Sequence, residues 1–335
     1  MLKKSIFTIL PMSLAAFMLV GCSTNVSEDG IPEVSDTAEA SATTQPSGES
    51  ETIDASFIEN QNIDIAYGGP WESQKLDIYL PDEEKGPFPV IMAIHGGGFI
   101  QGDKTGLDIE PMLEGVNRGY AVVSVNYRLS SEALFPAAIS DVKAAIRFVK
   151  ANAEEFNLDP EKIAVWGSSA GGHLAALAGT SGDDDSLNGK NTENLGYSSE
   201  VQAVVDWYGQ IDFLEIDEQF ADSGITPKLG ERSKNDSPES SYMGSSIPEK
   251  QEEVKKANPE TYITENDPAF FIQHGTDDAN VPVQQSIDFE GNLKNVLGEE
   301  KVELTLFDGA VHGGEPFSSE ENLDEVFGFL DRVLK

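Results

Sequence analysis

Cysteine is almost absent from this chain of 335 residues, which contains only Cys22. A single cysteine cannot form an intramolecular disulfide, and no cysteine pair is available to bind zinc or to exchange disulfides. The sequence also lacks an H-E-x-x-H motif and any carboxylate–histidine cluster at ligand spacing. We therefore expect neither a metal nor another cofactor.

Basic residues are scarce: 22 lysines and arginines face 59 aspartates and glutamates, for a net charge of −37. This charge repels phosphates, so we expect no nucleic-acid partner and no attraction to anionic lipid through a basic patch. The acidity is typical of a well-solvated surface and does not define a substrate. The length fits one α/β domain.

The amino-terminal segment reads as a secretory signal: Met1 to Lys4 is basic and Ser5 to Val20 is largely apolar. Residues 1–21 are therefore predicted to be removed. The following "LVGC" and "STN" resemble the bacterial lipobox, which implies a lipid on Cys22. The alternatives are an uncleaved anchor and a plain secretory signal. We expect an extracytoplasmic protein that meets the membrane only through this lipid.

Residues 22–56 contain no lysine or arginine and are rich in serine, threonine, alanine and acidic residues. Such a segment buries too little apolar surface to offset its chain entropy. It is predicted to be a disordered tether, followed by a catalytic domain at residues 57–335.

From about Phe57 onward, β-type and helical segments alternate. The first two β-type segments predict an antiparallel opening, and those that follow predict a mostly parallel central sheet flanked by helices. The β-type segments are "NIDIAYGG", "QKLDIYLP", "FPVIMAIHGG", "YAVVSVNYRL", "KIAVWGSS", "VQAVVDWYG", "AFFIQHG" and "VELTLFDG". The helical runs are 108–118, 137–153, 172–179, 283–297 and 319–334. A polar insertion near residues 213–259 is a candidate cap.

A G-x-S-x-G pattern occupies Gly167 to Gly171 between a β-type and a helical segment. A strand that turns sharply into a helix exposes its central residue and needs small neighbours. Ser169 is central; Ser168 cannot be, since Trp166 would then occupy the first small position. The pattern predicts Ser169 as a nucleophile, whereas the structural alternative is a tight turn without chemistry.

The stretch "IHGGGF", residues 94–99, offers consecutive backbone N–H groups without side chains. Gly97 and Gly98, together with the N–H of Ala170, are predicted to form an oxyanion hole. The alternatives are a plain glycine turn and a phosphate nest, but the Lys-Ser/Thr pair of a phosphate loop is absent.

The chain has only four histidines. His312 lies in a glycine-rich loop after the last β-type segment and is the predicted general base. His95 is expected to fix the glycine loop, and His274, at a strand end, to be structural. His173 follows Ser169 by one helical turn and is expected to lie beside the turn rather than above it.

The base needs an acid that orients its ring. Asp278, in "HGTDDANVP", gives the chain order Ser, Asp, His and is the predicted acid. Asp277 and Asp212 remain alternatives.

From about Phe88 to the end, the chain resembles the HGGG-type esterases of the α/β-hydrolase fold, in the hormone-sensitive-lipase-like and BD-FAE groups. The resemblance rests on "HGGGF", "YRLSSEALFPAAISDVKAAIRFVKANAEEF", "GSSAGGHLAAL", "DWYG", "DSPES", "ANPETYI", "HGTDDANVP" and "GAVHGG". It implies the same nucleophile, acid, base and oxyanion donors: Ser169, Asp278, His312, Gly97, Gly98 and Ala170. It also implies that "YRL" and "FPAA" support the site and that 213–259 forms a substrate-facing rim.

These features predict a serine carboxylesterase that hydrolyses short-chain acyl esters, acetyl or aromatic, including esters on polysaccharide. One alternative is a prolyl-oligopeptidase-like serine peptidase, although the chain has no room for the large amino-terminal propeller of that class. Another is a non-catalytic binding lipoprotein on a hydrolase scaffold. The sequence does not identify the natural ester, the oligomeric state or any lid motion.

Overall fold

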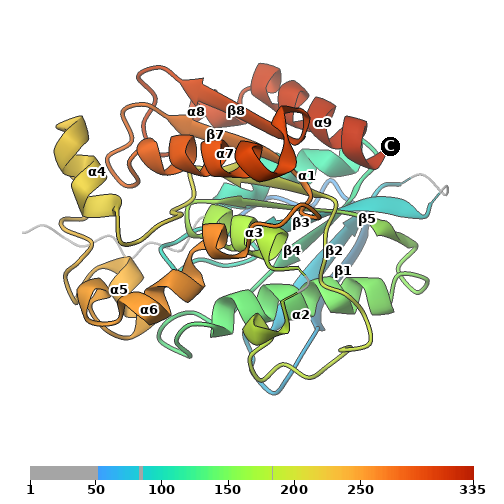
Figure 1. The fold of residues 1–335 in the computed structure, drawn as a ribbon. Helices are drawn as coiled ribbons and strands as arrows, with labels where there is room; N and C mark the ends of the chain where they lie inside the picture. Colours follow the sequence, from blue (N-terminus) through green and yellow to red (C-terminus); the bar gives the residue numbers. More distant parts are fainter. Residues whose placement is uncertain (1–51, 83–85, 183) are drawn as a thin grey trace, which may run out of the picture. The chain divides into compact units, whose positions relative to one another are not determined.

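The computed structural model describes residues 52–82, 86–182 and 184–335 (Figure 1). The predicted signal sequence, Cys22 and most of the predicted tether lie outside the described residues. Within them, the Ile53 N–H donates to the carbonyl of Thr105 at 2.9 Å, and Ile58 is buried. Contacts with the domain therefore begin before the predicted boundary at residue 57.

Eight strands form one mixed sheet in the order β1-β2-β4-β3-β5-β6-β7-β8. β1 pairs antiparallel with β2, and β2 pairs antiparallel with β4; every other neighbouring pair is parallel. This confirms the antiparallel opening and the mostly parallel sheet. The strands are β1 (Asn60–Ala66), β2 (Lys75–Leu80), β3 (Phe88–Ile94), β4 (Ala121–Val125), β5 (Leu158–Ser168), β6 (Ala203–Trp207), β7 (Ala269–Gly275) and β8 (Val302–Phe307).

Among the described residues, five helices follow the predicted runs closely, and the structure adds three short helices in the insertion and one after the His312 loop. They are α1 (Glu110–Asn117), α2 (Ala137–Ala151), α3 (Ala170–Thr180), α4 (Ile216–Ser223), α5 (Pro238–Met243), α6 (Gln251–Val254), α7 (Gln284–Leu297), α8 (Glu315–Ser318) and α9 (Glu320–Leu334). The predicted run 108–118 begins instead as the 3₁₀ turn η1 (Leu107–Ile109) and becomes α-helical at Glu110. No helix of the described residues is long and apolar enough to cross a membrane.

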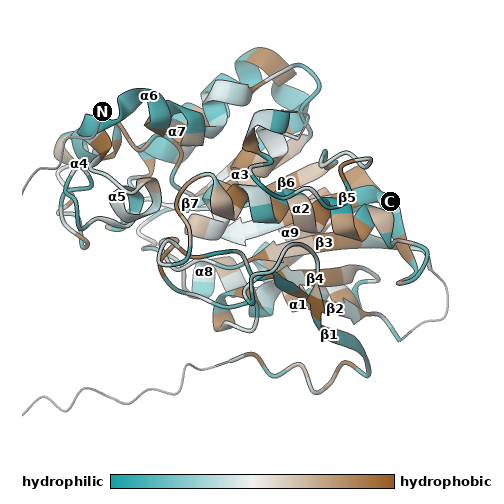
Figure 2. Ribbon diagram, turned by 90° about the horizontal axis from the view of Figure 1, so that it is seen from below, coloured by the Kyte–Doolittle hydropathy of each residue, from teal (hydrophilic) through white to brown (hydrophobic). Residues whose placement is uncertain are grey.

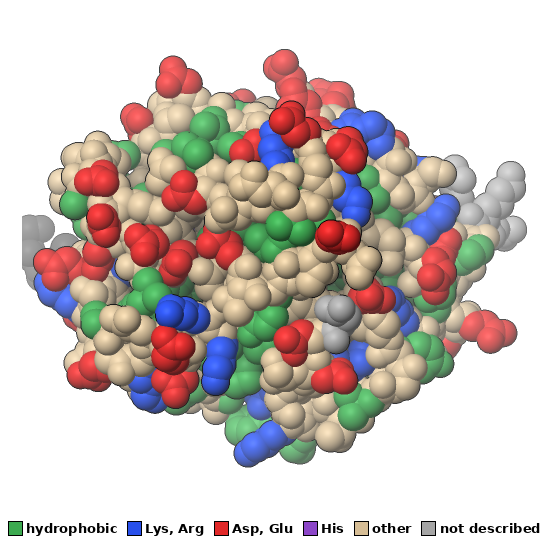
Figure 3. Space-filling view, in the orientation of Figure 1, with side chains coloured by type: hydrophobic (Ala, Val, Ile, Leu, Met, Phe, Trp, Pro, Cys, Tyr) green, Lys and Arg blue, Asp and Glu red, His purple; other side chains and the backbone are tan. Residues whose placement is uncertain are grey.

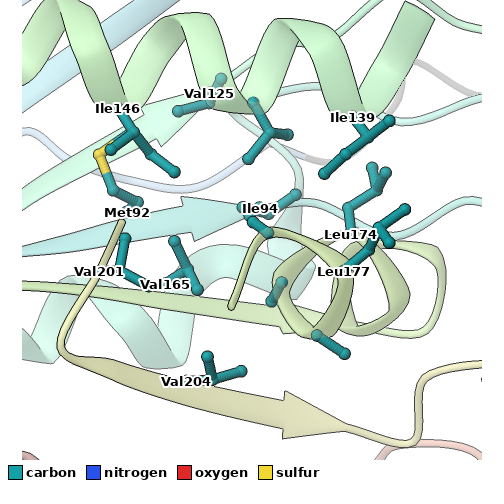
Figure 4. Close-up of a cluster of buried hydrophobic side chains, with 14 of the residues drawn as sticks. Met92, Ile94, Val125, Ile139, Ile146, Val165, Leu174, Leu177, Val201 and Val204 are labelled. Carbon is teal, nitrogen blue, oxygen red and sulfur yellow. The ribbon is translucent and has the colours of Figure 1, made fainter. Parts of the chain in front are cut away.

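Two apolar layers hold helices against the two faces of the sheet. Side chains alternate along β3: Met92 and Ile94 join the layer with α2, α3 and α7, whereas Ile91 and Ala93 join the layer with α1 and α9. Figure 4 shows the first layer, with Met92 and Ile94 facing helical side chains such as Ile146 and Leu174. Because both faces are covered, the central strands are apolar throughout, as their brown colour in Figure 2 shows.

Helix α9 illustrates how the sequence sets its own boundaries. The Ser319 side chain accepts a hydrogen bond from the Asn322 N–H at 3.3 Å and caps the first turn. Leu323, Val326 and Phe327 follow at helical spacing and are buried against the sheet.

The parallel strands bring four loops to one edge of the sheet. The glycine loop follows β3, Ser169 follows β5, the Asp278 loop follows β7 and the His312 loop follows β8. Carboxyl ends of parallel strands meet at a common edge, where α/β folds carry their sites. The insertion between β6 and β7 forms the short helices α4, α5 and α6, at the left of Figure 1.

Candidate active site

Ser169 occupies a strained turn between β5 and α3. Its φ is 54° and its ψ is −120°, outside the usual regions for a residue with a side chain. A Cβ on Gly167 would lie 2.1 Å from the carbonyl oxygen of Gly171, and a Cβ on Gly171 would lie 2.1 Å from that of Ile94. Glycine is therefore required on both sides of Ser169 because backbone atoms already fill the space.

Ser168 is buried beneath this turn and has a partner that the sequence did not indicate. Its hydroxyl donates to Asp108 Oδ2 at 3.2 Å, and the Gly96 N–H donates to the same oxygen at 2.6 Å. Asp108, in η1, thus ties the serine turn to the glycine loop. No motif pointed to Asp108, since it lies 60 residues from Ser168 and the sequence placed it only in a helical run.

The glycine loop keeps two backbone donors open. Gly97 and Gly98 have φ values of 102° and 61°, which favour glycine. The Gly96 N–H is used by Asp108, whereas no hydrogen bond within the described part of the chain uses the N–H of Gly97 or Gly98. Two unused donors on a rigid loop suit an oxygen that gains negative charge.

His95 and Tyr127 support this loop from below. Their rings stack with centroids 4.3 Å apart, and the Tyr127 hydroxyl donates to the His95 carbonyl at 2.9 Å. His95 Nδ1 lies 2.8 Å from the Gly96 carbonyl oxygen. These contacts agree with the predicted supporting roles of His95 and of the "YRL" segment.

Asp278, and not Asp277, reaches His312. His312 Nδ1 lies 2.6 Å from Asp278 Oδ2, and Asp278 is fully buried while Asp277 is exposed. The other Asp278 oxygen accepts the backbone N–H groups of Asn280 and Val281 at 2.7 and 2.9 Å. The carboxylate is therefore fixed on both sides.

His274 is a second imidazole on the same carboxylate. Its Nε2 lies 3.2 Å from Asp278 Oδ2 and 3.0 Å from the Val281 carbonyl oxygen. Both atoms are acceptors, so Nε2 carries the proton, and Nδ1 accepts from the Ser286 hydroxyl at 2.7 Å. Burial raises the pKa of Asp278, but the hydrogen bonds from His274 and His312 outweigh burial and hold that pKa well below its usual range.

An ionised Asp278 dictates the tautomer of His312. Because the carboxylate only accepts, His312 Nδ1 carries the proton and Nε2 keeps a lone pair for another donor. The Tyr208 ring packs against His312 with centroids 4.5 Å apart. Burial raises the pKa of Tyr208, which keeps its phenol neutral beside the imidazole.

His173 is buried and does not line the cleft that contains Ser169, which agrees with the expectation that it lies beside the turn rather than above it. Its Nδ1 lies 2.6 Å from the Gln210 carbonyl oxygen, and its ring stacks on Phe213. Burial lowers the pKa of His173 to about 4, so this ring stays neutral near pH 7.

One cleft of about 530 Å³ joins these groups. Its lining includes Ser169, His312, Gly97 and Gly98, and Ala170 is buried at the first turn of α3. The insertion contributes further lining residues: Leu229, Arg232 and Pro238. Residues 52–82, 86–182 and 184–335 hold no group of three or more histidines, cysteines or acids placed to bind a metal ion.

The strand order and the loops at this edge define the α/β-hydrolase fold. The bifunctional GH43-CE of Bacteroides eggerthii matches with a TM-score of 0.73 and 33% identity, over 82% of this chain and 35% of that chain. A truncated carbohydrate esterase from gut microbiota matches with a TM-score of 0.71 and 30% identity, over 84% of this chain and 99% of that chain. The predicted fold is confirmed.

Sequence comparison identifies the family. The BD-FAE family model matches residues 76–293. The probable carboxylic ester hydrolase LipM of Mycobacterium tuberculosis is 36% identical over 235 residues, 70% of this chain and 52% of LipM. The chain therefore belongs to the BD-FAE family, one of the two groups that its motifs resemble. It spans about half the length of the curated relatives it matches.

Proposed function

We propose that this protein is a serine carboxylesterase that removes short-chain acyl groups, acetyl or aromatic, from carbohydrate. The observation that carries the proposal is the 2.6 Å contact between His312 and a buried Asp278, in a cleft that also contains Ser169 and the glycine loop. Such a cleft combines a nucleophile, an oriented base and unused backbone donors.

In the proposed mechanism, Ser169 Oγ attacks the ester carbonyl carbon while His312 Nε2 takes the hydroxyl proton. The bond between the carbonyl carbon and the alcohol oxygen then breaks, and the alcohol leaves with the proton from Nε2. Water adds to the acyl-serine, again losing a proton to Nε2. When the acid leaves, that proton returns to Ser169. Asp278 stays ionised and stabilises the imidazolium.

Negative charge that develops on the carbonyl oxygen needs donors in place before the reaction. The N–H groups of Gly97, Gly98 and Ala170 fill this role. One such donor contributes about 10²–10³-fold to the rate, because a rigid loop needs no reorganisation at the moment of reaction.

The carbohydrate part of the proposal rests on the relatives. Two solved structures of at least 30% identity carry titles that name a GH43-CE protein and a carbohydrate esterase. LipM, a curated relative, is named only as a probable carboxylic ester hydrolase.

A panel of esters tests this proposal. Acetyl, long-chain and feruloyl esters, together with acetylated xylan, are compared with wild type and Ser169→Ala. We expect hydrolysis of acetyl or feruloyl esters by wild type and its loss in the variant. Activity retained in Ser169→Ala refutes the assignment of the nucleophile.

Two rival functions predict other results. A prolyl-oligopeptidase-like peptidase would cleave a peptidyl anilide much faster than 4-nitrophenyl acetate. A non-catalytic binding lipoprotein would fail to react with a fluorophosphonate probe, whereas an activated Ser169 becomes covalently labelled.

We also propose that the protein is an extracytoplasmic lipoprotein anchored through Cys22. Its support is the sequence alone, from the basic and apolar amino terminus to "LVGC". Radiolabelled fatty acid should be incorporated by the full chain in a bacterial host and not by Cys22→Ser; equal labelling of both would refute the anchor.

A further inference from the structure

The wall of the cleft beside Ser169 contains polar side-chain atoms that are buried and have no hydrogen-bond partner. They are Gln210 Oε1, Arg232 Nε and Asn280 Oδ1. An unpartnered buried polar atom costs about 1–3 kcal/mol, so such atoms are rare unless a ligand or water satisfies them. Three of them in one cleft wall indicate a binding surface that the substrate completes.

Arg232 is held rigidly at the centre of this wall. Its side chain is 1% exposed, it donates through Nη2 to the Asn280 carbonyl, and Nη1 lies 3.5 Å from Glu239 Oε2. The backbone N–H of Arg232 donates to Asp217 Oδ1 at 2.6 Å. A guanidinium fixed in this way presents its remaining N–H groups in one geometry.

The charges around Arg232 disfavour an anionic ligand. Glu239 already lies beside the guanidinium, and Asp217 accepts from the backbone N–H of Arg232. Asp108 also lines the cleft. The whole chain carries a net charge of −37, and acidic side chains are spread over the face in Figure 3. A carboxylate or phosphate would approach several negative charges for one positive charge.

A neutral hydroxyl group suits the same wall. The open atoms are one donor, Arg232 Nε, and two acceptors, one each on Gln210 and Asn280. A hydroxyl both donates and accepts, so neighbouring hydroxyls on one ring can satisfy donors and acceptors together. An acetyl group has no hydroxyl, and in the proposed mechanism its carbonyl oxygen accepts from the N–H groups of the glycine loop. The acetyl group therefore does not satisfy this wall.

We propose that Arg232, Gln210 and Asn280 form a subsite for ring hydroxyls on the alcohol part of the ester, a neutral sugar. This proposal rests on the proposed esterase function. It assigns specificity to Arg232 in the insertion, to Gln210 in the loop after β6 and to Asn280 in the loop that follows Asp278. The sequence alone assigned none of these three residues a role.

Two esters with the same acyl group test the subsite: an O-acetylated methyl β-xyloside and cyclohexyl acetate, whose ring has no hydroxyls. The readout is the ratio of their kcat/KM values. We expect this ratio to fall about tenfold or more in Arg232→Met and in Gln210→Met, because each loses a hydrogen bond made only with the sugar.

Arg232→Met also removes the hydrogen bond to the Asn280 carbonyl in the loop that follows Asp278. The loss of that bond alone would slow both esters equally, so it would not change the ratio. An unchanged ratio in both variants overturns the subsite. Arg147→Met is the matched control, since Arg147 is a buried arginine at a different cavity, and it should keep the wild-type ratio.

Methyl ferulate and methyl cinnamate test the acyl side. If the variants lower the ratio of these two esters instead, the wall binds a hydroxyl of the acyl group, and the assignment to the sugar is wrong. A succinyl monoester carries a free carboxylate. If wild type hydrolyses it with a higher kcat/KM than the acetyl ester, the choice of a neutral ligand is wrong.

Binding of methyl β-xyloside, followed by NMR titration, separates this proposal from the proposed function because it needs no catalysis. Weaker binding to Arg232→Met and Gln210→Met than to wild type supports the subsite even if no ester is hydrolysed. Equal binding to all three proteins refutes it, whatever the esterase assays show.

Discussion

Two parts of one cleft are built on different principles: the serine turn, residues 167–172, and the insertion wall, residues 229–238. In the turn, glycines are required because backbone oxygens lie within 2.1 Å of where a Cβ would stand on Gly167 or Gly171. In the wall, Arg232 is placed by an ion pair with Glu239 and a hydrogen bond to the carbonyl of Asn280, and its Nε stays without a partner. The turn holds a reacting atom in place, whereas the wall offers unsatisfied groups to a ligand.

The largest expected effect is the loss of kcat when the nucleophile is removed, compared with substitutions of neighbouring residues that do not react. Ser169→Ala should lower kcat by about 10⁴-fold or more, because the nucleophile is removed. Leu229→Ala in the wall and Ser168→Ala in the turn should each lower kcat about tenfold or less. Steady-state kinetics on 4-nitrophenyl acetate measures all three; comparable losses would mean that the turn and the wall do not divide the work in this way.

Backbone strain gives the next comparison. Gly171→Ala should lower the free energy of unfolding by about 3 kcal/mol or more, because its Cβ would overlap the Ile94 carbonyl oxygen. Gly230→Ala in the wall should lower it by only about 1 kcal/mol, since Gly230 has a φ of 73° but open space around it. Urea denaturation measures both, and equal losses would contradict the steric argument for the turn.

The next prediction concerns His274, whose Nε2 contacts the predicted acid Asp278. His274→Phe should lower kcat/KM about tenfold, because one hydrogen bond to the charged Asp278 is lost, about 1.5 kcal/mol. Ser286→Ala, which touches only the far nitrogen of the ring, is the control and should have a smaller effect. An unchanged kcat/KM in His274→Phe would contradict a part for this histidine in holding the acid.

The smallest effects concern two buried acids with opposite pKa shifts. The pKa of Asp278 is lowered, so its contribution to stability is present above the unfolded-state pKa of about 3.9 and is lost as the pH falls through the folded-state value. Burial raises the pKa of Glu239 beyond what Arg232 offsets, so stability from Glu239 is lost as the pH rises above about 4.3.

Unfolding measured from pH 2 to pH 7 tests both signs. The stability deficit of Asp278→Asn should shrink toward pH 2, whereas Glu239→Gln should gain on wild type as the pH rises from 4 to 7. Parallel curves for wild type and both variants would contradict the opposite shifts.

Much of the fold was predictable because its signals are local. Alternating or continuous apolar runs located all eight strands, and helical spacing located the main helices to within a few residues. The insertion was predicted as a polar cap and a substrate-facing rim, without its helices. Its short helices and the position of Arg232 depend on contacts with Asp217, Glu239 and Asn280, which no local pattern encodes.

Within the candidate site, the sequence pointed to Ser169, Asp278 and His312, and the structure adds the contact between the last two. Asp108, Gln210 and Asn280 were not indicated. Each lies in the cleft because separate loops converge at the carboxyl edge of the sheet. Single polar residues in such loops look like ordinary surface residues in a sequence.

The sequence by itself determined the turn at Ser169 and the open glycine loop, because both are set by the space between neighbouring backbone atoms. Only the tertiary structure decided that Asp278 rather than Asp277 meets His312, since that choice depends on which carboxylate is buried between two distant imidazoles. It also decided that a buried Arg232 lines the same cleft as Ser169 with Nε unpartnered, because the carbonyl of Asn280, 48 residues along the chain, helps to hold it there.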